Sequence, residues 1–213
     1  MGYSKELIKY CYRIYKRKGR PKGSVLVASV PRCGSTFLVR ALGCFGPGST
    51  CPKTFDCCFV RDLACLPNKK FMKTHSLAPS SIPEDVKVIF LFGDPVAAIV
   101  STYQKRFDHD HFLNCGYHSD SYPDIFNRDD LGYERIFDAW TREGKGYPVL
   151  AVRYEKLFDN VNILQDFLEC EIDLGKKKSR TTVINPDTAR SLSIVYKSLI
   201  NKVNSFPDVK LLS

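Results

Sequence analysis

One loop of the sequence combines the residue types that hold a phosphate or sulfate group. The run PRCGSTF at positions 31–37 follows a β-branched stretch and precedes a segment with helical apolar spacing. Gly34 lets the backbone approach an anion, Ser35 and Thr36 add hydroxyl donors, and Arg32 adds a cation beside the first turn of the helix. The sequence therefore predicts an anion cradle here, with a simple strand-turn-helix junction as the alternative.

This loop departs from two other kinds of anion-binding loop. A nucleotide triphosphatase loop reads G-x-x-x-x-G-K-[ST], but Ser29 stands where its first glycine is needed and Ser35 where its lysine is needed. A cysteine phosphatase loop needs an arginine six positions after the cysteine, and Val39 stands there, with Arg40 one place too far. The sequence argues against both activities.

A second segment carries residues suited to acid-base chemistry. In FMKTH, at positions 71–75, Lys73 and His75 are two residues apart. In an extended segment they point the same way, one as a cation and the other as a base with a pKa near neutrality. The sequence predicts proton transfer beside an anion. The alternative for His75 is a hydrogen-bonded, half-buried residue.

Apolar runs of strand type place these loops. Such runs occupy 24–30, 87–92 and 147–152, with a weaker one at 70–74, and helical patterns occupy 36–44, 96–107, 131–143, 162–168 and 188–203. Strands that alternate with helices predict an α/β fold with a parallel sheet. Ligands of such sheets bind at the carboxyl ends of the strands, so the site is expected just after 30, 74, 92 and 152.

Length and charge bound the remaining possibilities. The 213 residues are expected to form one domain over 1–213, with a basic helix at 1–22, core segments at 24–160 and a helical part at 161–213. The 32 Lys and Arg against 23 Asp and Glu favour an anionic partner. No apolar run is long enough for a membrane span or a secretory signal, which predicts an intracellular, cytoplasmic protein.

Cysteines and histidines are common metal ligands, so their spacing indicates whether a metal-binding site is expected. The nine cysteines include no C-x-x-C pair, so reduced thiols are the simpler interpretation. A possible ligand cluster is formed by His109, His111, Cys115 and His118, but a solvated loop is the better interpretation.

Four segments, in order, resemble the sulfotransferases that use 3′-phosphoadenosine 5′-phosphosulfate (PAPS). PRCGSTF resembles the family's 5′-phosphosulfate loop, and FMKTHSLAPSSIP its Lys-Thr-His segment. KVIFLFGDPVAAIVSTYQ is similar to the 3′-phosphate segment, and VLAVRYEKLFDN to the strand that ends in Tyr-Glu. The resemblance implies a three-layer, P-loop-like sulfotransferase fold, with a central, mostly parallel sheet of about five strands flanked by helices.

The resemblance also implies roles for matched residues. Arg32 would stabilise the leaving oxygen, Lys73 would contact the sulfuryl oxygens, and His75 would be the general base. PAPS would be the donor without a metal, and the acceptor a hydroxyl or amine of a small molecule or glycan, with no specific nucleic-acid binding. The residues implied to bind PAPS are Arg32, Cys33, Gly34, Ser35, Thr36, Phe37, Ser101, Tyr154 and Lys177.

The sequence departs from the family pattern at one position, which leaves alternative functions open. The family carries an arginine where this chain has Gly93, so a cation for the 3′-phosphate is missing there. Lys105, Arg106 or the basic run 176–180 would have to replace it, although that run is equally expected as a solvated loop. The alternatives are a degenerate nucleotide-binding member of the same fold and, less favoured, a small-molecule or nucleotide kinase. Acceptor choice would fall to loops 44–68, 76–85 and 108–130.

Overall fold

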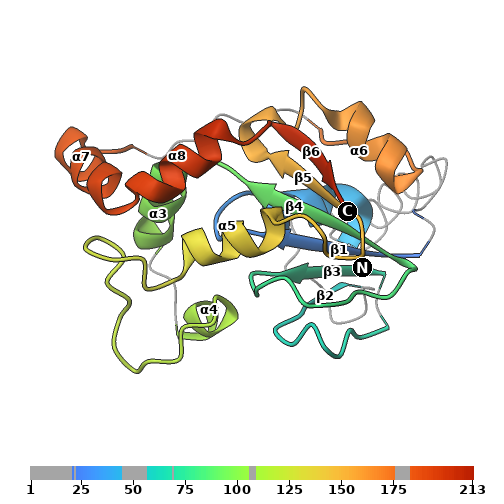
Figure 1. Cartoon of the computed structure of the whole chain (residues 1–213), viewed down its shortest axis with the longest axis horizontal. Helices are drawn as coiled ribbons and strands as arrows, with labels where there is room; N and C mark the ends of the chain where they lie inside the picture. Colours follow the sequence, from blue (N-terminus) through green and yellow to red (C-terminus); the bar gives the residue numbers. More distant parts are fainter. Residues whose placement is uncertain (1–20, 22, 45–56, 69, 106–108, 176–182) are drawn as a thin grey trace, which may run out of the picture.

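The computed structural model describes residues 21, 23–44, 57–68, 70–105, 109–175 and 183–213. Within these residues, one sheet runs in the order β2-β3-β1-β4-β5-β6 (Figure 1). Its members are β1 (Ser24–Ser29), β2 (Cys57–Phe59), β3 (Phe71–Thr74), β4 (Val86–Phe92), β5 (Val149–Arg153) and β6 (Val209–Leu212). Neighbouring strands are parallel except for the antiparallel β5–β6 pair. The predicted α/β fold with a mostly parallel sheet is confirmed, with six described strands where about five were expected.

The helices cover both faces of the sheet. They are α2 (Ser35–Val39) with its π-helical extension (Arg40–Cys44), α3 (Pro95–Gln104), α4 (His109–Asn114), α5 (Tyr133–Thr141), α6 (Val161–Leu168), α7 (Pro186–Val195) and α8 (Lys197–Ser205), plus a 3₁₀ turn at Tyr154–Lys156. One buried cluster joins the sheet to α3, α5, α7 and α8, and a second joins it to α2 and α6. Figure 1 shows α5 crossing one face. The three-layer arrangement is therefore confirmed.

The central strands are apolar throughout because both of their faces are buried. In β4, Val88, Phe90 and Phe92 belong to the cluster under α3 and α5, whereas Ile89 and Leu91 belong to the cluster under α2 and α6. Alternate side chains of a strand point to opposite faces, so a strand covered on both sides reads as a continuous apolar run.

The C-terminal part differs from the prediction in two ways. The helix expected over 188–203 is broken at Tyr196, whose buried hydroxyl donates to the Ile125 carbonyl (2.9 Å) in a distant loop. The expectation of a helical part over 161–213 is also wrong at its end, because β6 pairs with β5 there. The basic helix predicted over 1–22 lies outside the described residues, apart from Pro21.

The register of the sheet brings the expected loops together. Ala28 pairs with both Thr74 and Phe90, and Phe92 pairs with Arg153. The segments that follow β1, β3, β4 and β5 therefore emerge at one edge of the sheet. No helix in the described part of the chain is long and apolar enough to span a membrane.

Candidate active site

The loop after β1 has a tightly constrained backbone. Arg32 and Gly34 both have left-handed φ values, 65° and 85°. Gly34 is the N-cap of α2, and its carbonyl accepts from the Leu38 N–H (3.0 Å). A side chain at Gly34 would overlap the ring of Tyr154, which follows β5. Glycine is needed here for its backbone angle and for the space that the ring occupies.

Arg32 reaches from this loop to α3. Its Nε donates to Ser101 Oγ over 3.1 Å. Ser101 is held in place because Asp94 caps α3, accepting from the N–H groups of Val96 (2.9 Å) and Ala97 (3.2 Å), with Pro95 at the first position. The structure thus joins two residues, Arg32 and Ser101, that the sequence places 69 positions apart.

Lys73 makes the corresponding link from β3. Its Nζ donates to Thr36 Oγ1 over 3.0 Å and lies 5.3 Å from the centre of the Phe59 ring. The loop between β1 and α2 therefore brings together two cations, its own Arg32 and Lys73 of β3, with the hydroxyls of Thr36 and Ser101. This donor set suits an oxyanion such as phosphate or sulfate.

His75 lies behind these cations and is 2% exposed. Its Nδ1 donates to the Ser29 carbonyl oxygen (2.9 Å), with Ser29 Oγ 3.1 Å away. The rings of Phe59 and His111 have centroids 5.5 and 5.9 Å from that of His75. The segment that follows is fixed by Trp140, whose Nε1 donates to the Ser76 carbonyl (2.8 Å).

The pKa of His75 differs from the sequence expectation. Burial, followed by the positive charge of Lys73 and smaller effects of His111 and Arg32, lowers the pKa from 6.5 to about 3, although the bond to the Ser29 carbonyl raises it. The expected near-neutral pKa is wrong for the chain by itself, because Phe59, His111 and Ser29 enclose a ring that the sequence places at an open strand end.

This pKa predicts a sensitivity to acid. Because the unfolded chain binds a proton at His75 below pH 6.5 and the folded chain does so only near pH 3, stability is lost as the pH falls through that range. We expect the free energy of unfolding to be about 2 kcal/mol lower at pH 5 than at pH 7 through this group alone. Denaturant unfolding of the unmodified chain and of His75→Gln at both pH values measures it. An equal loss in both proteins would assign the acid sensitivity to other groups.

Of the other residues predicted to bind the donor, four are described by the structure and Lys177 is not. The side chain of Cys33 lies in the core, and its N–H donates to the Val30 carbonyl (3.2 Å). Ser35 is buried, and the Phe37 ring packs 5.6 Å from that of Phe158. Tyr154 lies against Gly34, as described above. The predictions for Lys177 and the basic run 176–180 fall outside the described residues.

The carboxylate of Glu155 lies beside Gly93. A Cβ at Gly93 would lie 2.9 Å from both carboxylate oxygens of Glu155, and the N–H of Asp94 donates to Glu155 Oε1 (3.3 Å). The position of Glu155 beside Gly93, where it accepts from the Asp94 N–H, was not predicted from the sequence. Its place next to Tyr154 at a strand end was a signal.

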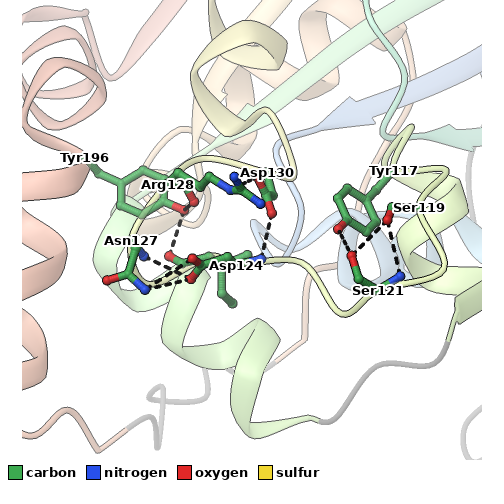
Figure 2. Close-up of polar contacts among 9 residues, drawn as sticks. Tyr117, Ser119, Ser121, Asp124, Asn127, Arg128, Asp130 and Tyr196 are labelled. Carbon is green, nitrogen blue, oxygen red and sulfur yellow. Dashed lines mark hydrogen bonds and ion pairs between the residues drawn. The ribbon is translucent and has the colours of Figure 1, made fainter.

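One of the loops expected to select the acceptor is held by a polar network. Figure 2 shows Asp124 accepting from the backbone and side chain of Asn127, while Asp130 accepts from the Asp124 N–H (2.7 Å) and pairs with Arg128 (2.7 Å). Tyr196 anchors the same loop from the junction of α7 and α8. In the same region, the side chain of Phe112 is buried in the core. The loop is thus a fixed part of the fold.

The possible metal ligands whose side chains the structure describes do not form a cluster. Among the side chains that the structure describes, no three His, Cys, Asp or Glu lie together as a metal site requires. His111, one of the four candidates, instead lies edge-on to His75. The side chain of His109 is outside the described part.

A comparison with models of known protein families identifies the family of this chain. A family model described as "Sulfotransferase domain" matches residues 59–206, a range that contains Lys73, His75, Ser101 and Tyr154 but begins after the loop at 31–37. The solved structures that resemble this one include mouse sulfotransferase SULT7A1 complexed with PAP, at 15% sequence identity and a TM-score of 0.42, covering 96% of this chain and 72% of that one. No protein of curated function matches the sequence.

Proposed function

Because the chain belongs to the sulfotransferase domain family, we propose that it transfers a sulfuryl group from PAPS to a hydroxyl or amine of a small-molecule or glycan acceptor. The observation that carries this proposal is the meeting of a buried histidine with two cations at the edge of the sheet. Both Lys73 and Arg32 lie close enough to His75 to lower its pKa. A base beside an anion-binding cradle is the arrangement that sulfuryl transfer to a hydroxyl needs.

The residues of the site fit the donor. PAPS supplies an activated sulfuryl group, and Lys73 with Thr36 would hold its oxygens. Arg32 would stabilise the charge on the bridging oxygen as the bond from that oxygen to sulfur breaks. Nε2 of His75 would take the acceptor's proton as the acceptor oxygen bonds to sulfur. Gly34 leaves room for the ring of Tyr154, which would border the nucleotide.

The negative charge of the bound donor would also raise the pKa of His75. Burial is the main cause of the low pKa of His75, and the positive charges of Lys73 and Arg32 lower it further. An anion bound between these two cations would offset their effect and raise the pKa of His75 toward its ordinary range. Donor binding would therefore make His75 a better base, although its burial would still hold the pKa below the ordinary value.

A second candidate function rests on Gly93. The carboxylate of Glu155 lies where a cation for the 3′-phosphate is expected, which favours a family member that binds nucleotide weakly and has lost transfer. A kinase remains disfavoured, because the loop has Ser35 where ATP-binding loops have lysine.

Calorimetric titration with 3′-phosphoadenosine 5′-phosphate (PAP) tests the proposal. We expect micromolar binding that is selective over ADP and over ATP with Mg²⁺, followed by turnover of radiolabelled PAPS. Binding of PAP without any turnover would favour the second candidate. Failure to bind PAP, or a preference for ATP, would contradict both functions.

Gly93→Arg is expected to tighten PAP binding about tenfold, since a charge-assisted contact to phosphate contributes about 1.5–3 kcal/mol and Glu155 would compete for the new guanidinium. Glu155 is the flexible neighbour that must shift to admit the side chain. Gly93→Ala is the matched control, because it adds the same Cβ without the charge and should give no gain. Equal affinities of the two variants would mean that no phosphate lies near residue 93.

A further inference from the structure

The hydrogen-bond partner of the proposed base is a residue with no assigned role. Ser29 is the last residue of β1 and is 0% exposed. It presents two oxygens to one nitrogen of His75, the carbonyl at 2.9 Å and the hydroxyl at 3.1 Å from Nδ1. Ser29 and His75 are 46 positions apart in the sequence, so only the parallel pairing of β1 with β3 brings them together.

These contacts determine which ring nitrogen carries the hydrogen. A carbonyl oxygen can only accept, so the hydrogen lies on Nδ1, and Nε2 keeps its lone pair. We propose that Ser29 is a positioning residue whose carbonyl and hydroxyl oxygens hold His75 in the tautomer that leaves Nε2 as the proton acceptor. This inference rests on the proposed function, in which His75 is the base. Ser29 would act through His75 and not directly on the acceptor or the sulfuryl group.

The backbone around Ser29 is rigid enough for this role. Ser29 pairs with Leu91 of β4, and the next residue, Val30, donates its N–H to the Leu91 carbonyl (3.1 Å). The Ser29 carbonyl is therefore fixed by the sheet and not by a mobile loop. Phe59 and His111 limit rotation of the His75 ring from its sides. With 2% of His75 exposed, water has little access to replace the Ser29 oxygens.

Ser29 also links the base to the donor loop. Arg32 follows it by three residues and carries the contact to Ser101. One short stretch of chain thus fixes the tautomer of the base and starts the loop that would bind the donor. The distance between the base and the donor is set within β1 and its immediate continuation.

The tautomer can be measured without any activity. The chain has four histidines, so long-range ¹H–¹⁵N NMR of histidine-labelled protein at pH 7 gives few signals, and His75→Gln identifies those of His75. We expect a pyrrole-type Nδ1 and a pyridine-type Nε2 for His75. A protonated Nε2 with a bare Nδ1 would overturn the proposal. This result does not depend on whether the chain is a sulfotransferase.

A kinetic test separates positioning from structural support. We expect Ser29→Ala to lower kcat for hydrolysis of radiolabelled PAPS about tenfold with the KM for PAPS unchanged, and Ser29→Thr to restore it. Thr141→Val is the control, because it removes a hydroxyl that donates to the Phe137 carbonyl (2.8 Å) within α5. A higher KM with unchanged kcat would place the effect of Ser29 on the donor loop and overturn the proposal. If Ser29→Ala does not fold, the NMR measurement on the unmodified chain still decides.

Discussion

Replacing His75 with alanine is expected to lower PAPS turnover about 10²- to 10⁴-fold while PAP affinity stays nearly unchanged. The reason is geometric: His75 is buried behind the two cations, and its Nδ1 is engaged by Ser29, so it would act on the acceptor's proton and not on the nucleotide. Turnover of radiolabelled PAPS and calorimetry with PAP measure the two effects separately.

The control for this variant is a second histidine. His118 is exposed, and His118→Ala should leave PAPS turnover as it is in the unmodified chain. His75→Gln keeps a polar side chain in the buried position and should be as inactive as His75→Ala. Turnover that survives in both His75 variants would show that another group, or water alone, takes the proton.

Gly34→Ala is expected to weaken PAP binding at least about a hundredfold and to lower the free energy of unfolding by about 2–4 kcal/mol. The φ of 85° opposes any side chain, and the new Cβ would overlap the ring of Tyr154. Either the loop or the ring must move, and both lie where the donor would bind. Calorimetry with PAP and denaturant unfolding measure the two losses.

Two further variants separate backbone strain from the steric overlap. Gly144 also has a positive φ, 72°, but no atom within 4 Å of a would-be Cβ, so Gly144→Ala should cost only about 1–2 kcal/mol of stability and no PAP affinity. Adding Tyr154→Ala to Gly34→Ala removes the overlap and should recover part of the lost stability. If Gly34→Ala behaves like Gly144→Ala, Tyr154 does not press on the loop in solution.

The sheet was predictable where burial makes a strand apolar on both faces. This holds for β1, β4 and β5, and less clearly for β3. The strands β2 and β6 were missed because they have only three and four residues, too few for a clear apolar pattern. The break at Tyr196 was missed as well, since it depends on the Ile125 carbonyl, 71 positions away, and not on a glycine or proline.

The candidate site was predictable as a set of residue types but not as a network. Arg32, Lys73 and His75 carry their chemistry in the side chain and lie at or just after the ends of two strands, β1 and β3. The residues that tune them carry no such signal: Ser29 drew attention only as a departure from a glycine, and Phe59 lies in a segment without strand character. Because the pKa of His75 depends on what encloses the ring, it could not be predicted from spacing along one strand.

The antiparallel strand β6 has a consequence for how this protein behaves in solution. The strand beneath it, β5, leads directly into Tyr154 and Glu155, and β6 pairs with it from Val209 to Leu212. An uncovered β5 would offer unpaired N–H and C=O groups to strands of other molecules, which is the usual route to aggregation. In β6, Lys210 forms an ion pair with Glu143 (2.7 Å), a charge of the kind that discourages further strand addition. By pairing with β5, β6 therefore also protects the protein against aggregation through that strand.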